Sequence, residues 1–326
     1  MNPRRRSALA TFAILGLAAV LASRALAAFP ERPLELIAPY PPGGAADTVS
    51  RLIANALGAE LGQPVTVVNK PGGGTVIGAQ AAKNAAPDGY TLFLGTNSTF
   101  MLNPAVRNDL PYDGARDFEA VGMIGEVPLG ILVRADSPYQ NLAQLVAAAK
   151  ADPRRLNYAS YGNATVPHFA GEMFKSASGI GMEHIPYQGS APAMNDLLGG
   201  RVQVSFDTLV AAVPQLEAGR IRILAVTTTR RSGKLPNVPT VAESGFPGYD
   251  ISSWAAILTP RGLSAPVKAK LVDALRVALA KPEVQSRLRE LGYEPSFDPL
   301  ANWADLVPRE TTRMRAIANK AQIKVD

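Results

Sequence analysis

The sequence predicts an α/β protein built as two lobes, and three observations support this class. Between residues 34 and 95, short apolar runs alternate with helical patterns through three successive units. A second stretch, from about residue 130, repeats the same alternation. No linker rich in proline or serine separates the two stretches. Repeated strand–helix units give a parallel sheet covered by helices on both faces.

In the first stretch, strands are expected at residues 34–38, 65–68 and 90–95, and helices at 49–61 and about 76–85. The first helix is predicted because apolar residues recur at i, i+3, i+4, i+7, i+8 and i+12, which places them on one helical face. Glycine and proline turns close both helices.

The second stretch follows the same order. Its expected strands are 130–133, 156–158, about 184–187, 202–206 and 221–226. Its expected helices are 142–150, about 167–176 and 192–198, and the C-terminal helices are about 267–279, 284–291 and 303–318. Two lobes without a linker are expected to be joined by crossing strands. Their ligand cleft would then lie between them, at the carboxyl ends of strands.

The composition excludes several classes of function. The chain of 326 residues has no cysteine, which rules out disulfides, thiolate nucleophiles and cysteine-bound metals. It has two histidines, His168 and His184, so a histidine-rich metal site is also disfavoured. The net charge of +6 comes mostly from four arginines in residues 1–27, and beyond them 29 basic residues face 27 acidic ones. Nucleic-acid binding is therefore not expected.

Residues 1–27 are expected to be a secretory signal peptide. Three arginines precede an apolar run, and Ala25-Leu26-Ala27 supplies the small residues of a cleavage site. The alternative is a membrane anchor, but the 17 uncharged residues between Arg6 and Arg24 fall short of the roughly 20 that span a bilayer. The mature protein is expected to be exported and to begin near Ala28.

The first candidate binding loop runs from Tyr40 through Pro42, Gly43, Gly44 and Ala45 to Asp47, between a strand and a helix. Backbone N–H groups at a helix start favour a carboxylate or phosphate, so Gly43 and Gly44 are expected to donate to a ligand. The alternative is a plain turn in which Asp47 complements the helix dipole. A second glycine turn, 71–74, is interpreted as a flexible turn in preference to a phosphate loop.

The second-lobe loop holds Ser160, Asn163 and Thr165 and leads into a helix with His168. Other polar groups at strand ends are Asn97, Ser98, Thr99, Tyr187, Gly189 and Asp207. Neutral hydrogen-bonding loops that converge from two lobes indicate a site for a small polar molecule. A catalytic triad of Ser160, His168 and Asp207 is the alternative. It is disfavoured because the chain has no G-x-S-x-G elbow and His168 falls inside a helix. No catalytic residue, metal site or cofactor is predicted.

Several ordered segments together resemble one family. They are Tyr40–Gly44 with Asp47 and Arg51, Asn69–Gly74, Ala86–Leu92, Arg134–Pro138, Leu156–Tyr158, His168–Glu172, Pro186–Ala193, Asp196–Gly200 and Leu235–Glu243. From about Pro30 to its end the chain resembles the Bug family, the TctC-like periplasmic solute-binding receptors of tripartite tricarboxylate transporters.

The resemblance implies a type II periplasmic-binding-protein fold with two α/β lobes. It implies a periplasmic receptor, expected to be monomeric, that closes on a carboxylated solute such as a di- or tricarboxylate, an acidic amino acid or an aromatic acid. In such receptors backbone groups, hydroxyls and bridging waters hold the carboxylate, with little help from arginine. Ala164 stands where the family commonly has a glycine, and Val166-Pro167 stand where it has small polar residues, which bears on the ligand's identity.

The expected lobes are 28–127 and 225–326 for the first and 128–224 for the second. Transporter subunits are the expected partners. The alternatives are a sensory receptor that presents its closed form to a sensor-kinase ectodomain, and an exported hydrolase that uses Ser160 and His168. The residues expected at the ligand are Tyr40, Pro42, Gly43, Gly44, Ala45, Asp47, Asn97, Ser98, Thr99, Ser160, Asn163, Thr165, His168, Tyr187, Gly189 and Asp207.

Overall fold

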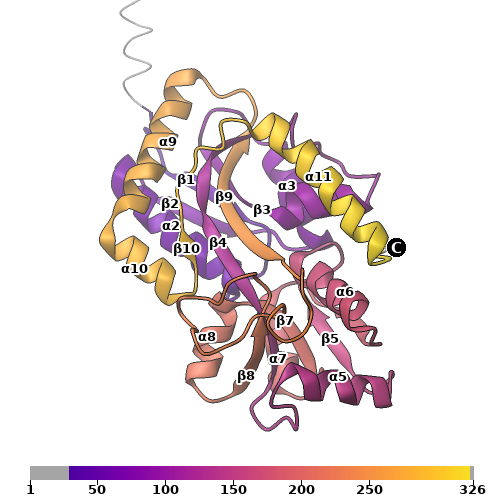
Figure 1. Ribbon diagram of the computed structural model, residues 1–326. Coiled ribbons are helices and arrows are strands. Elements are labelled where there is room, and N and C mark those ends of the chain that lie inside the picture. The colour runs from indigo at the N-terminus through magenta and orange to yellow at the C-terminus, as the bar shows by residue number, and fades with distance from the viewer. Residues whose placement is uncertain (1–28, 324–326) are drawn as a thin grey trace, which may run out of the picture.

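One curved sheet of ten strands runs through the computed structural model, which describes residues 29–323. The order along it is β2-β1-β3-β9-β4-β7-β5-β6, with β8 and β10 also paired to β4. The sheet bends where β4 passes from one α/β lobe to the other (Figure 1). The export signal expected in residues 1–27 lies outside the described residues.

The first lobe is formed by both ends of the described chain. Its strands are β1 (Leu34–Ala38), β2 (Val65–Asn69), β3 (Thr91–Thr96), β9 (Ser252–Pro260), β10 (Glu294–Pro295) and the first part of β4 (Phe118–Arg134). Its helices are α2 (Ala45–Leu61), η1 (Gly73–Thr75), α3 (Val76–Lys83), η2 (Ser98–Leu102), α4 (Asn103–Val106), α9 (Ala265–Ala280), α10 (Pro282–Glu290) and α11 (Trp303–Lys320). The strands β2, β1 and β3 are parallel, as the repeated units predict, whereas β9 is antiparallel to β3.

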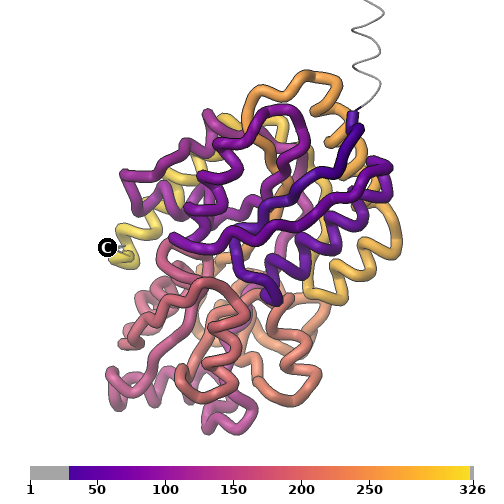
Figure 2. Tube along the Cα trace, turned by 180° about the vertical axis from the view of Figure 1, so that it is seen from behind, coloured from indigo at the N-terminus to yellow at the C-terminus, as the bar shows by residue number. Residues whose placement is uncertain are grey.

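The second lobe lies between the two crossings. Its strands are β5 (Asn157–Ser160), β6 (Glu183–Pro186), β7 (Val204–Thr208), β8 (Ile221–Val226) and the end of β4. Its helices are α5 (Leu142–Ala151), α6 (Val166–Ser178), α7 (Ser190–Leu198) and α8 (Leu209–Glu217). Seen from the opposite side, residues of this lobe form a separate body below the first (Figure 2).

Two neighbouring crossings join the lobes. The strand β4 pairs with β9 from Phe118 to Pro128 and with β7 and β8 from Leu129 onward. The return segment runs beside it, because Thr227 accepts the N–H of Ile251 at 3.0 Å and its Oγ1 accepts that of Leu129 at 3.1 Å.

The boundary expected between residues 224 and 225 falls inside β8. We propose instead that the chain returns at the start of β9, because Val241, Tyr249 and Ile251 are buried in the same apolar cluster as the second lobe's Phe174 and Phe206.

Apolar clusters are buried in each lobe, and a further cluster contains residues of both lobes. The first lobe buries an aromatic cluster that includes Phe93, Phe100 and Phe118, with ring centroids 5.0 Å apart between Phe100 and Phe118. The second buries Phe169, Phe174 and Phe206 among others. No helix within residues 29–323 is long and apolar enough to cross a membrane.

Candidate functional site

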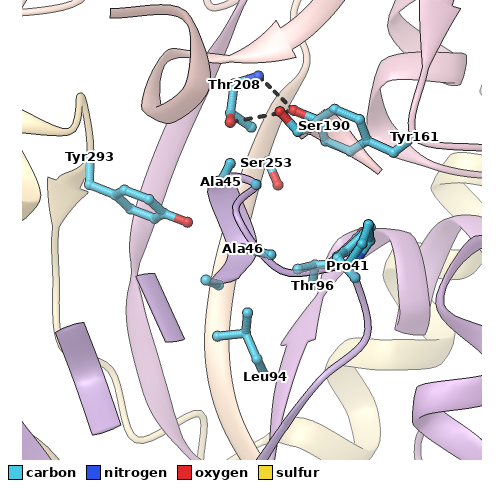
Figure 3. Close-up of a pocket in the computed structure, with 13 residues that line it drawn as sticks. Pro41, Ala45, Ala46, Leu94, Thr96, Tyr161, Ser190, Thr208, Ser253 and Tyr293 are labelled. Carbon is cyan, nitrogen blue, oxygen red and sulfur yellow. Dashed lines mark hydrogen bonds between the residues drawn. The ribbon is translucent and has the colours of Figure 1, made fainter. Parts of the chain in front are cut away.

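A cavity of about 40 Å³, called here the first cavity, lies where the two lobes meet. The residues that line it from the first lobe are Tyr40, Pro41, Gly44, Ala45, Ala46, Leu94, Thr96, Ser253, Ala255 and Tyr293. Those from the second lobe are Tyr161, Ser190 and Thr208 (Figure 3). Hydroxyl groups and backbone atoms line the cavity, and none of the described residues that line it has a charged side chain.

Three helices begin at this cavity. The helix α2 follows Gly44, α8 follows Thr208, and α7 begins at Ser190. The first N–H groups of a helix have no partner within it and carry a partial positive charge. Helix starts from both lobes therefore converge on a space that suits a negatively charged group.

The starts of α2 and α7 face each other across the cleft at close range. A Cβ atom placed on Gly44 would lie 3.4 Å from the backbone nitrogen of Ala191. On the other side, a Cβ atom on Gly189 would lie 2.7 Å from Cδ of Pro41. Glycine at both positions lets the two backbones approach when the lobes are closed.

A buried carboxyl group lies directly behind the second-lobe wall of the first cavity. The hydroxyl of Ser190 donates to Asp207 at 2.7 Å, and the hydroxyl of Tyr161 donates to the other carboxylate oxygen. The N–H of Thr208 donates to the Tyr161 hydroxyl at 2.9 Å. Burial raises the pKa of Asp207 to about 7, against the lowering effect of these hydrogen bonds. Asp207 thus fixes two of the lining hydroxyls.

A second cavity, of about 210 Å³, shares Tyr40 and Tyr161 with the first. Both tyrosines line the two cavities, and their rings meet edge to face with centroids 6.0 Å apart. The remaining residues that line the second cavity are Pro39, Gly72, Gly73, Gly74, Thr75, Arg107, Gly162, Asn163, Pro186, Tyr187 and Gln188. This cavity is also shared by the two lobes.

Direct contacts between the lobes border the second cavity. Oγ of Ser98 accepts the N–H of Val166 at 3.1 Å, which satisfies a donor at the start of α6 from the opposite lobe. Gly74 lies against the backbone of Asn163. Ser98 therefore holds the lobes together and does not line either cavity.

In the first loop, several expected ligand groups are occupied within the protein. The N–H of Gly43, expected to meet a ligand, donates to Asp47 at 3.0 Å, and Asn69 donates to Asp47 at the same distance. Burial raises the pKa of Asp47, but Arg51 and these hydrogen bonds outweigh it and lower the pKa. Asp47 thus shapes the loop, while Pro42 is exposed and lines neither cavity.

The second-lobe loop is likewise held by internal bonds. Thr165 donates to the carbonyl of Gly162 at 2.7 Å, and Nδ1 of His168 accepts the N–H of Ala164 at 3.2 Å. Ser160 contacts Nε2 of His184 at 2.6 Å. Because Ser160 pairs with His184 while Asp207 pairs with Tyr161 and Ser190, the structure does not assemble the alternative triad.

The remaining expected site residues divide between contacts and cavity walls. Thr99 shares a 2.9 Å hydrogen bond with Thr75, and Asn97 donates to the carbonyl of Ser252 at 2.8 Å. Asn163 and Tyr187 line the second cavity. Of the expected set, Tyr40, Gly44 and Ala45 line the first cavity.

Sequence reasoning missed most of the first cavity's wall. Tyr161, Ser190 and Thr208 adjoin residues that it did select, so the strand-end pattern contained their signal. Thr96 directly follows the predicted strand 90–95 and precedes the polar run 97–99 that is expected at the ligand. Ser253 and Tyr293 belong to segments with no assigned strand or motif.

The two histidines form a stacked pair whose protonation should weaken the fold. Their ring centroids are 4.1 Å apart. Burial lowers the pKa of His168 to about 4, with help from Lys175, and burial together with His168 lowers that of His184 to about 3. Below pH 6.5 the two histidines bind protons in the unfolded chain but stay neutral in the folded protein. The free energy of unfolding therefore falls as the pH drops toward their lowered pKa values.

Between pH 6.5 and 4.5 we expect the free energy of unfolding of His184→Gln to fall by about 2 kcal/mol less than that of wild type. Urea unfolding of wild type and His184→Gln at each pH measures this difference. Asp207 has the opposite effect on stability as the pH falls, but its effect is the same in both proteins and cancels in the comparison. Equal losses in the two proteins would contradict the assignment.

Comparison with known proteins gives consistent matches across most of the chain. The family described as the tripartite tricarboxylate transporter family receptor matches residues 49–323. Protein BugT of Bordetella pertussis strain Tohama I is 34% identical over 295 residues, which cover 87% of this chain and 90% of BugT.

Two solved structures are similar over nearly their whole length. Rpa4515 of R. palustris, solved with adipate, is 35% identical, with a TM-score of 0.88 over 91% of this chain and 99% of that one. MatC of Rhodopseudomonas palustris, solved with bound malate, is 31% identical, with a TM-score of 0.82 over 89% of this chain and 99% of that one.

Proposed function

The chain belongs to the tripartite tricarboxylate transporter receptor family, and from that premise we propose that it captures a small carboxylated solute between its lobes for a membrane transporter. The solute is released or handed on when the lobes part, so no covalent chemistry is involved. Its place of action is the periplasm, where receptors of this kind meet their solutes.

The observation that carries the proposal is the convergence of three helix starts on the first cavity. Their N–H groups offer a partial positive charge without a positively charged side chain, and hydroxyls such as those of Thr96, Thr208 and Ser253 surround the same space. A carboxylate placed there gains hydrogen bonds from both lobes. Binding therefore stabilises the closed arrangement, as in other hinged binding proteins.

The relatives support the same class of ligand. One neighbour was solved with adipate and another with malate, both dicarboxylates. We propose that the ligand of this chain is a carboxylic acid of similar size, with one carboxylate at the first cavity. The residues assigned to it there are Tyr40, Gly44, Ala45, Thr96, Tyr161, Ser190, Thr208 and Ser253.

A thermal-shift screen against small mono-, di- and tricarboxylates, with adipate and malate among them, tests the proposal. A ligand at 100 times its dissociation constant should add about 2.7 kcal/mol to the free energy of unfolding. The expected result is a raised melting temperature with at least one acid, and no breakdown of that acid on long incubation. A screen in which no acid shifts the melting temperature, or one in which the acid is consumed, would overturn it.

Asp207 should make binding of the acid depend on pH. Its pKa of about 7 means that the group behind Ser190 is mostly neutral at pH 6 and mostly charged at pH 8. Because a negative charge there repels a carboxylate, we expect wild-type affinity to fall about fivefold between these values, about 1 kcal/mol. Asp207→Asn, which stays neutral, should show no such fall. Calorimetry at pH 6, 7 and 8 measures the affinity of both proteins. The same fall in affinity in both would show that Asp207 does not act on the bound carboxylate.

A further inference from the structure

The second cavity has one charged side chain among the described residues that line it, the guanidinium of Arg107. Nε of Arg107 is buried and has no hydrogen-bond partner. A buried donor without an acceptor is costly, and a charged donor more so. Within residues 29–323, no carboxylate lies in ion-pair contact with this guanidinium.

The acids near the outer side of Arg107 are already paired. Arg107 also borders a groove on the surface of the first lobe, together with Asp113 and Asp117. Asp113 pairs with Arg116 at 2.9 Å, and Asp117 pairs with Lys83 at 2.9 Å. The positive charge of Arg107 is therefore not neutralised from that side.

Hydrogen bonds fix the backbone of Arg107 beside the glycine turn 71–74, which the sequence predicts to be a flexible turn. Its own N–H donates to the carbonyl of Asn103 at 2.9 Å, which ends α4. The amide of Asn103 donates to the carbonyl of Gly74 at 2.7 Å and to that of Ser98 at 2.9 Å. Asn103 thus ties α4 to the turn, which places Arg107 at a cavity that Asn163 and Tyr187 line from the other lobe.

We propose that Arg107 is a specificity-determining residue that binds a second anionic group of the ligand. The inference rests on the proposed function, because the first carboxylate is assigned to the first cavity. Tyr40 and Tyr161 line both cavities, so a ligand with an acidic group at each end would pass beside their rings. A fork of guanidinium N–H groups matches a carboxylate in geometry and in charge.

Matched pairs of acids separate this role from general ligand binding. Succinate, adipate and suberate would each be compared with the monocarboxylate of equal chain length by calorimetry. Wild type should bind at least one diacid more tightly than its partner. Arg107→Gln should lose at least tenfold of that diacid's affinity, about 1.4 kcal/mol, and leave the affinity for the monoacid unchanged. Arg107→Lys keeps the positive charge but loses the fork of N–H groups, so its affinity for the diacid should lie between those of wild type and Arg107→Gln.

Arg116→Gln is the matched control. It removes a positive charge from the same outer groove, on a side chain that is 81% exposed, without touching the second cavity. It should not change the preference for diacids. Equal loss for both acids in Arg107→Gln, no loss for either, or the same loss in Arg116→Gln would overturn the role of Arg107 and leave the receptor function standing. Failure of every acid to bind wild type would instead overturn the proposed function, and the assignment of Arg107 with it.

Discussion

Gly74→Ala is expected to weaken binding of the acid found in the screen by about a hundredfold, about 2.7 kcal/mol. Gly74 belongs to the first lobe, and a Cβ atom on it would overlap the backbone carbonyl oxygen of Asn163 in the second. A backbone carbonyl cannot change rotamer to avoid the clash as a side chain can, so the two lobes would have to move apart or shift. The affinity falls because the population of the closed, binding-competent form falls.

Gly73→Ala is the matched control for this change. Both glycines have a left-handed backbone, with φ of 63° at Gly74 and 60° at Gly73, so alanine costs about 1 kcal/mol of strain at each. A Cβ atom on Gly73 would meet Cβ of Val76 in its own turn, at 3.3 Å, and no atom of the second lobe. Similar losses of affinity in the two variants would show that strain in the turn, and not contact between lobes, causes the effect.

Much of the fold could be predicted from residue patterns. Alternating units place the parallel strands β1, β2 and β3 correctly, and the helical spacing places α2. The resemblance to the Bug family and the two-lobed periplasmic-binding-protein fold that it implies are confirmed by the family match and by solved relatives.

The strands that cross between the lobes were the hardest to predict. The pattern gave only residues 130–133 of β4, although the strand starts at Phe118. Gly122 and Gly125 interrupt its alternation, and the register against β9 shifts next to each of them. An extra residue at a bulge reverses which face the following side chains occupy, so a period of two fails there. Helix α8 was also not predicted. Pro214 lies inside it, and a proline within a segment usually indicates that a helix ends there.

The place where strand-end loops converge was easier to predict than the residues that line the cavities there. Strand-end loops do converge at the junction of the lobes, as expected of parallel strands. Which side chain of a loop faces the cleft depends on contacts made by distant segments. Ser98 is turned to Val166 and Ser160 to His184, and neither partner is signalled by local sequence. Arg107 follows a four-residue helix without any motif, and only the folded chain brings it to a cavity.

The start of α2 provides the second test of closure. Gly44 has φ of −92° and ψ of −179°, a backbone that any residue can adopt, so a substitution there adds bulk without backbone strain. A Cβ atom would lie 3.4 Å from the nitrogen of Ala191 and 3.5 Å from Cβ of Ser190, which leaves room for one methyl group. The branches of valine would extend further, toward α7 and over the N–H groups assigned to the ligand.

We therefore expect Gly44→Val to weaken binding of the same acid at least tenfold, about 1.4 kcal/mol, while Gly44→Ala changes it less than threefold. The melting temperature of each variant without ligand should stay near that of wild type, because the added methyl groups meet the other lobe and not the core of their own. Calorimetry on the three proteins separates bulk from backbone. If valine binds as well as alanine does, the start of α2 does not approach α7 in the bound form, and the carboxylate must be held elsewhere in the cleft.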